Sequence, residues 1–257
     1  MDTCAQQPAH AVSLLSLSVG SWRFSVGRTA PIPTDLTRLY DGTAWRWHSS
    51  IGLLGYSRAY ANLFNRLKAD YWLVDLRDGA KVLDAGIGTG ALSMALSKFL
   101  PKAHELHGVD ISPRMLARAR DNLRQRRHPG ITTHLRYGDV NDLAYRDQEF
   151  DMAMCAHLLE HCQSPLRTLG EMARVLRVGA PLLTVTTRSN RTASLHSLRW
   201  RYRPVESQQL VDWMHQAGLH DVRRYALGAG FSLPGRLSEA YIARKAETCA
   251  ELPVATI

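Results

Sequence analysis

The sequence predicts an α/β protein built on a doubly wound, mostly parallel β-sheet. From residue 81 to residue 187, short apolar runs alternate with stretches of helical spacing, as a parallel sheet with crossover helices requires. The first apolar run ends at Leu83, and a Gly-rich turn, residues 84–90, separates it from a helical pattern. A strand, a Gly-rich turn and a helix in this order form the entrance of a nucleotide-type binding site.

The expected strands follow one another in the order that this fold class requires. After the strand that ends at Leu83, we expect strands at residues 106–109, 132–136 and 150–155, a fifth that ends near residue 187, and closing strands at 222–227 and 240–243. The helix after the Gly-rich turn is predicted by five apolar residues at helical spacing: Leu92, Ala95, Leu96, Phe99 and Leu100. The sheet is therefore predicted to have seven strands.

The Gly-rich turn holds the first candidate binding residues. Gly86, Gly88 and Gly90 allow the backbone to turn sharply and to approach a ligand, but this spacing also fits a dinucleotide site. Asp84 favours another ligand, because a carboxylate at this point would repel an anionic pyrophosphate. It would attract the ammonium and sulfonium of S-adenosylmethionine. The simpler interpretation of Asp84 is a carboxylate that interacts with a helix dipole.

The second strand is followed by groups that suit an adenosine. Asp110 lies 24 residues after Gly86, where a carboxylate can accept hydrogen bonds from the two ribose hydroxyls. Ile111, and Met115 one turn later, would offer an apolar face to the adenine. The alternative for Asp110 is a plain N-cap of the helix that begins at Pro113.

The third and fourth strands end in further polar residues. Asp139 would accept a hydrogen bond from the adenine amine, and its alternative is an acid that closes a turn. His157 and His161 are four residues apart, so a helix would place them on one face, at a spacing that metal sites also use. No third ligand is evident, and we expect no metal.

Five motifs in this order resemble class I S-adenosylmethionine-dependent methyltransferases, especially the small-molecule branch that includes ubiquinone and menaquinone biosynthesis methyltransferases. They are residues 84–90 (DAGIGTG), 108–116 (GVDISPRML), 138–140 (GDV), 159–161 (LEH) and 171–176 (EMARVL). Residues 177–180 depart from the basic residue and Pro-Gly-Gly that are common there, in a turn that only joins a helix to a strand. The resemblance implies a Rossmann-like sheet and S-adenosylmethionine as cofactor, and it adds Val140 and Ala156 to the predicted cofactor-binding residues.

The resemblance also implies methyl transfer to a small-molecule acceptor, whose accepting O, N or C atom stays open. His161 follows the fourth strand, where this fold places groups that face the reacting methyl, and it is the candidate catalytic base; a structural role is the alternative. Aromatic side chains before residue 75 and a basic insertion that carries Trp200 favour an aromatic or lipophilic acceptor.

Three other functions compete with this interpretation. The net charge of +9 suits a nucleic-acid methyltransferase, but residues 156–159 lack the Asn/Asp-Pro-Pro-aromatic motif of amine-modifying members, and no Pro-Cys pair occurs. We therefore expect no nucleic-acid partner. A protein that binds S-adenosylmethionine without catalysis is the second alternative, and a dinucleotide-dependent oxidoreductase, disfavoured by Asp84, is the third.

The chain length of 257 residues fits one domain with appended segments. We expect an N-terminal extension (1–34), a helical lid segment (35–75), a methyltransferase domain (76–245) with a substrate-side insertion at 188–204, and a tail (246–257). The extension reads either as a small hairpin around residues 20–21 or as an organelle transit peptide. The apolar stripe of residues 56–67 either packs on the core or lines a lid, and both can hold.

The cysteine pattern and hydropathy predict the compartment. The four cysteines form no Cys-x-x-Cys pair, which favours a reducing compartment. No apolar run reaches the ~18 residues of a membrane span. We therefore expect a cytoplasmic protein, and the basic insertion leaves peripheral contact with a membrane open. The oligomeric state cannot be read from the sequence.

Overall fold

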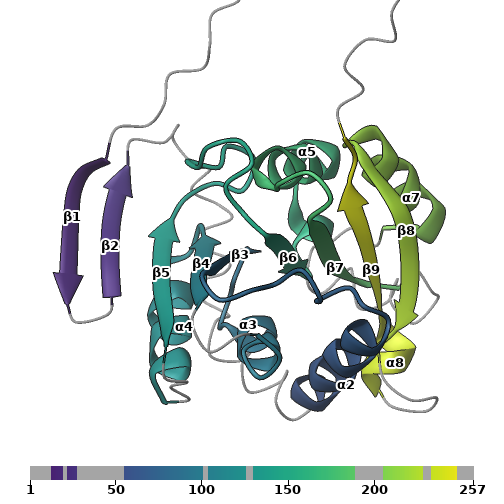
Figure 1. Ribbon diagram of the computed structural model, residues 1–257, viewed down its shortest axis with the longest axis horizontal. Coiled ribbons are helices and arrows are strands. Elements are labelled where there is room, and N and C mark those ends of the chain that lie inside the picture. Colours follow the sequence, from purple (N-terminus) through teal and green to yellow (C-terminus); the bar gives the residue numbers. More distant parts are fainter. Residues whose placement is uncertain are drawn as a thin grey trace, which may run out of the picture.

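The computed structural model describes residues 13–19, 22–27, 55–100, 104–125, 130–188, 205–227 and 233–247. Its strands form one sheet in the order β1-β2-β5-β4-β3-β6-β7-β9-β8 (Figure 1). Helices α2 and α3 lie on one side of this sheet, and α5 and α7 lie on the other (Figure 1). The doubly wound fold class is therefore confirmed.

Five parallel strands form the centre of the sheet: β3 (Ala80–Ala85), β4 (His104–Asp110), β5 (Ile131–Tyr137), β6 (Met152–Ala156) and β7 (Pro181–Thr187). The last strand, β9 (Ser238–Lys245), runs antiparallel to β7 and to β8 (Leu219–Ala226). These seven strands are the seven that the sequence predicts. The order reverses at β3, because β4 lies on one side of it and β6 on the other.

Two further strands extend the sheet at the β5 edge. β1 (Ser13–Val19) and β2 (Trp22–Gly27) are antiparallel, with Val19 opposite Trp22, so residues 20 and 21 connect them as expected for a hairpin. β2 then pairs with β5 in parallel, through Trp22 opposite Thr133 and Arg23 opposite His134. The hairpin interpretation of the N-terminal extension is confirmed, and the hairpin makes the sheet larger than predicted.

The helices that follow the strands are α3 (Ala91–Leu96), α4 (Pro113–Gln125), α5 (Pro165–Val175), α7 (Ser207–Gln216) and α8 (Leu233–Leu237). A single turn of 3-10 helix, η1 (Leu159–His161), follows β6. The predicted helix after the Gly-rich turn extends to Leu100, whereas α3 ends at Leu96. Phe99 and Leu100 still pack against the core, because the tight turn that follows α3 also points them inward.

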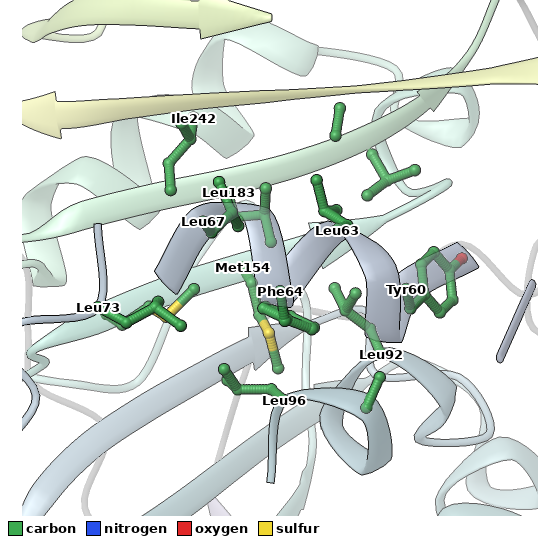
Figure 2. Packing of buried hydrophobic residues seen from close by; sticks show 14 of the residues in the cluster. Tyr60, Leu63, Phe64, Leu67, Leu73, Leu92, Leu96, Met154, Leu183 and Ile242 are labelled. Carbon is green, nitrogen blue, oxygen red and sulfur yellow. The ribbon is translucent and has the colours of Figure 1, made fainter. Parts of the chain in front are cut away.

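Helix α2 (Tyr56–Ala69) buries the predicted apolar stripe in the core. Figure 2 shows Leu63, Phe64 and Leu67 packed against side chains from α3, β6, β7 and β9, among them Leu96, Met154, Leu183 and Ile242. The core-packing interpretation of the stripe is confirmed. The rest of the predicted lid segment up to residue 54, most of the basic insertion and most of the tail lie outside the described residues. Within the described part, no helix combines the length and apolarity needed to cross a membrane.

Candidate functional site

The predicted binding residues meet at one edge of the sheet. β3, β4, β5 and β6 are parallel, so the residues that follow them lie at the same, carboxyl-terminal edge. This edge holds Asp84, the Gly-rich turn, Asp110, Asp139 and Ala156. It is also where the strand order reverses, which is the place where open α/β sheets bind ligands.

The three glycines of the turn adopt the left-handed conformation that favours glycine. Their φ angles are 66° at Gly86, 54° at Gly88 and 79° at Gly90. A Cβ on Gly86 would lie 2.7 Å from Cδ1 of Leu158, in the segment after β6. Among the described residues, a Cβ on Gly88 would approach only the Gly86 carbonyl oxygen, at 3.9 Å. A Cβ on Gly86 would therefore force the Leu158 side chain to shift, whereas the described residues place no side chain near the Cβ position of Gly88.

Asp110 connects the Gly-rich turn to β4. Its Oδ2 accepts a hydrogen bond from the Gly88 N–H at 2.8 Å, and its Oδ1 accepts one from the Ser112 N–H at 2.9 Å. The cap of α4 is a different residue, because the Met115 N–H donates to Oγ of Ser112 at 3.2 Å.

Asp84 is a buried carboxyl group behind the turn. The side chain is 1% exposed, and its Oδ2 accepts a 2.5 Å hydrogen bond from Oγ of Ser93 on α3. Burial raises the pKa of Asp84 to about 7, the hydrogen bond from Ser93 opposes this, and the charge of Asp110 adds to it. Ionising the Asp84 carboxyl group therefore costs free energy in the free protein, and a bound cation would favour the ionised form.

The remaining predicted cofactor-binding residues follow β4 and β5. One of them is an acid in a turn, and the others are apolar side chains. Oδ1 of Asp139 accepts hydrogen bonds from the Asn141 N–H at 2.8 Å and from Nδ2 of Asn141 at 2.9 Å. Asp139 therefore closes a turn, and its second oxygen can serve a ligand. Met115 and Val140 are buried, and Ile111 is half-buried.

The segment after β6 holds two residues whose importance the sequence does not reveal. His157 has a φ of 53°, and its Nδ1 lies 3.3 Å from Oε1 of Glu160 and 3.2 Å from Oγ1 of Thr187. Glu160 is 3% exposed, and its Oε1 also accepts the Thr187 N–H at 2.6 Å. Within the described residues, Oε2 of Glu160 is buried without a hydrogen-bond partner. The LEH motif contains Glu160, but a motif alone does not show these contacts.

His161 lies at the end of η1. Burial lowers the pKa of His161, although the charge of Glu160 acts in the opposite direction, so the imidazole is neutral at pH 7. The expectation that a helix would place His157 and His161 on one face is wrong. His157 precedes η1 with a left-handed backbone, and η1 is a single turn.

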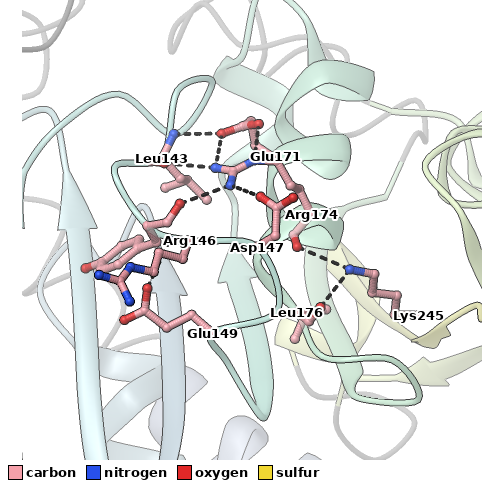
Figure 3. Close-up of polar contacts among 9 residues, drawn as sticks. Leu143, Arg146, Asp147, Glu149, Glu171, Arg174, Leu176 and Lys245 are labelled. Atoms are coloured by element: carbon pink, nitrogen blue, oxygen red, sulfur yellow. Dashed lines mark hydrogen bonds and ion pairs between the residues drawn. The ribbon is translucent and has the colours of Figure 1, made fainter. Parts of the chain in front are cut away.

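The EMARVL motif has a structural role (Figure 3). Glu171 and Arg174 of α5 form two hydrogen bonds at 2.8 Å, and Arg174 also donates to the carbonyl oxygens of Leu143 and Tyr145. Glu171 accepts the Leu143 N–H at 2.8 Å (Figure 3). Burial would raise the pKa of Glu171, but these hydrogen bonds lower it. The motif thus holds the chain between β5 and β6 against α5.

Comparison with known proteins identifies the domain. Residues 83–184 match the family model described as a methyltransferase domain. The chain is 28% identical over 171 residues to 2-methyl-6-phytyl-1,4-hydroquinone methyltransferase 1 of Oryza sativa subsp. japonica, covering 62% of this chain and 50% of that protein. It is 36% identical over 111 residues to a ubiquinone/menaquinone biosynthesis C-methyltransferase of Bordetella avium, covering 43% of this chain and 42% of that protein.

A solved structure agrees with this match. The magnesium protoporphyrin IX methyltransferase of Synechocystis PCC 6803, solved with bound SAH, superposes with a TM-score of 0.65 at 17% identity, covering 83% of this chain and 99% of that one. The chain spans about half the length of the curated relatives quoted above. Residues 83–184 therefore match a methyltransferase domain, and the chain has the fold of a class I S-adenosylmethionine-dependent methyltransferase.

Proposed function

We propose that this protein is an enzyme that binds S-adenosylmethionine and transfers a methyl group to a small-molecule acceptor. The observation that carries the proposal is the space that the described residues leave open at Gly88, whose N–H is held by Asp110 beside the buried carboxyl group of Asp84. A backbone held in this conformation can approach a ligand closely, and the two acids match the ribose hydroxyls and the cationic end of the cofactor.

The polar groups behind the turn support a cationic ligand. Asp84 lies on β3, and Glu160 lies in η1, which follows the neighbouring strand β6. Both carboxyl groups are buried. Oε2 of Glu160, buried and without a partner in the described residues, is a second acceptor for an ammonium group. Asp110 would bind the ribose, and Met115, Ile111 and Val140 would contact the adenine. Asp139 would accept from the adenine amine.

When bound, S-adenosylmethionine supplies a methyl group that its sulfonium already activates. The protein then mainly has to position the acceptor and exclude water, and good positioning can lower a barrier by roughly 7–11 kcal/mol. His161 would take a proton from a phenol or a carbon acid, because its imidazole is neutral at pH 7. His157 would hold Glu160 and the chain after β7 in place through its contact with Thr187.

The relatives favour an aromatic or lipophilic acceptor. Two of them are named for quinone-type molecules, and a third for a porphyrin. These acceptors are apolar and of moderate size, in agreement with the aromatic segment before residue 75 and with the basic insertion. We propose a cytoplasmic protein that can meet such an acceptor at a membrane surface, and we propose no nucleic-acid partner.

The test is transfer of an isotopically labelled methyl group by the full chain. A hydroquinone, a catechol, a primary amine and a structured RNA would be offered in parallel, with Asp110→Ala as the matched inactive control. The proposal expects label in the hydroquinone or the catechol and none in the RNA. Label in RNA alone would support the nucleic-acid alternative. Cofactor binding without transfer to any of a wide set of acceptors would support a non-catalytic binding protein.

A further inference from the structure

A cluster of three side chains lies outside the cofactor site. Glu105 and His107 are two residues apart on β4 and so project from the same face of the sheet. His134 of β5 is the direct register partner of His107 and shares that face. Helix α4 covers the opposite face, where Leu116 packs against Leu135.

The donor atoms of this cluster converge. Oε2 of Glu105 lies 3.1 Å from Nε2 of His107 and 3.8 Å from Nε2 of His134, and one ligand atom from each residue lies within 4.8 Å of the others. In a tetrahedral zinc site with metal–ligand bonds of ~2.0–2.1 Å, neighbouring ligand atoms are about 3.3 Å apart. The two imidazole rings are stacked, with centroids 4.5 Å apart and planes at 24°, so one ring must rotate before nitrogens of both rings can face the same ion.

We propose that Glu105, His107 and His134 form a binding site for one divalent transition-metal ion of the Zn²⁺ type. Two imidazoles and one carboxylate are a ligand set that such ions prefer, with water at the remaining position. The side chains of Glu105 and His134 are 38% and 22% exposed, so an ion can enter from solvent. The ring of His107 is held edge-on by Tyr145 and Phe150, which keeps one ligand in place before binding.

One neighbouring charge opposes the ion. Nζ of Lys81 lies 3.7 Å from Oε2 of Glu105 and 3.8 Å from Oε1 of Glu149. This ammonium must move away from Glu105 when a cation binds, and Glu149 offers it a second partner. The affinity of the site should therefore rise when Lys81 loses its charge.

The role of the proposed site is structural. His107 lies three residues before Asp110 on the same strand, a distance of about 10 Å, and the two residues alternate to opposite faces. An ion bound here would join β4 to β5 and would not reach the methyl-transfer site. It would stabilise the folded state according to its concentration and affinity.

The test uses the full chain, stripped of metal with a chelator and then titrated with Zn²⁺ alone. Equilibrium dialysis with metal analysis should give one ion per chain, and the midpoint of thermal unfolding should rise with Zn²⁺ concentration. Glu105→Gln and His134→Gln should each weaken binding by roughly tenfold or more. Both residues are partly exposed, so these variants should fold. Lys81→Met should bind Zn²⁺ more tightly than the native protein.

The matched control is His220→Gln, which replaces an exposed histidine on β8. It should leave Zn²⁺ binding unchanged. Absence of Zn²⁺ binding at micromolar concentrations would overturn the proposal. Binding that is as strong in Glu105→Gln and His134→Gln as in the native protein would also overturn it, because the ion would then occupy other groups, such as Cys162 and His161.

Discussion

The carboxylate of Asp110 accepts the N–H of Gly88 at 2.8 Å, and this hydrogen bond joins the end of β4 to the turn that follows β3. Asp110 is 9% exposed and holds the Ser112 N–H with its other oxygen. The residue expected to bind the ribose therefore also sets the shape of the backbone that the cofactor would approach. We therefore expect stability and ligand binding to be coupled at Asp110.

Asp110→Ala should lower both properties. The buried N–H of Ser112 and the part-buried N–H of Gly88 lose their acceptor, so the unfolding free energy should fall by about 1–3 kcal/mol. Loss of the charge-assisted ribose contact should weaken S-adenosylmethionine binding by a further ~1.5–3 kcal/mol. Thermal unfolding and calorimetry measure the two effects. Ser112→Ala is the control, because it removes the cap of α4 and should lower stability alone. Unchanged cofactor affinity in Asp110→Ala would refute the assignment of Asp110.

Gly88→Ala should separate backbone strain from ligand contact. A Cβ at Gly88 touches no side chain of the described residues, so the free protein should lose only the strain of a left-handed alanine, ~1–2 kcal/mol. Cofactor binding should fall much more, because the methyl group occupies the open space. Gly79→Ala is the control, because Gly79 lies at the opposite end of β3 and its φ of 83° gives the same strain. No atom of the described residues lies within 4 Å of its Cβ position. If both variants bind the cofactor equally well, the Gly-rich turn does not approach the ligand.

Asp84 should make cofactor binding depend on pH. Its pKa of about 7 means that the free protein holds a proton there at lower pH, and a bound cation would displace that proton. Affinity should therefore fall as pH drops below 7. When the pH falls from 8 to 6, the affinity of the native protein for the cofactor should drop. This drop should be about tenfold larger than the drop measured for Asp84→Asn.

Asp84→Asn should also raise the stability of the free protein at high pH. A carboxyl group with a raised pKa in the folded state stabilises the protein least at high pH, so Asp84→Asn should unfold at a higher temperature than the native protein at pH 8. Asp121→Asn, an exposed acid on α4, should change neither property. A native affinity that does not vary between pH 6 and pH 8 would show that Asp84 does not sense the cation.

Loss of the His161 side chain should lower the methyl-transfer rate, whereas loss of the His157 side chain should lower stability. His161→Ala should lower the methyl-transfer rate ~10²–10⁴-fold with little change in cofactor affinity, and the loss should shrink at high pH for an acidic acceptor. His157→Ala removes a partner of buried Glu160, so it should lower the unfolding temperature first. A stable and fully active His161→Ala protein would leave positioning alone as the catalytic contribution of the protein.

The strands could be predicted from the sequence because each is a short apolar run bounded by turn residues. The ends of these strands also placed Asp84, Asp110 and Asp139 at one edge, since parallel strands end together. The division of roles between Asp110 and Ser112 could not be predicted, because both residues suit a helix cap and only the three-dimensional hydrogen bonds distinguish them.

Contacts between distant segments could not be predicted from the sequence either, because they form only in the folded structure. His107 and His134 lie 27 residues apart along the chain and meet only through the β4–β5 register. The left-handed backbone of His157 and its contact with Thr187 depend on how β6 and β7 end beside one another. The spacing of His157 and His161 suggested a shared helix face, but a single 3-10 turn forms there.

Calorimetric titration of the full chain with S-adenosylmethionine at pH 7, beside Gly88→Ala and Gly79→Ala, tests the central claim most directly. We predict one site of micromolar-class affinity, on the order of −8 kcal/mol, which Gly79→Ala retains and Gly88→Ala loses. A folded native chain that binds no S-adenosylmethionine, or one that binds it equally well with alanine at residue 88, would contradict the account.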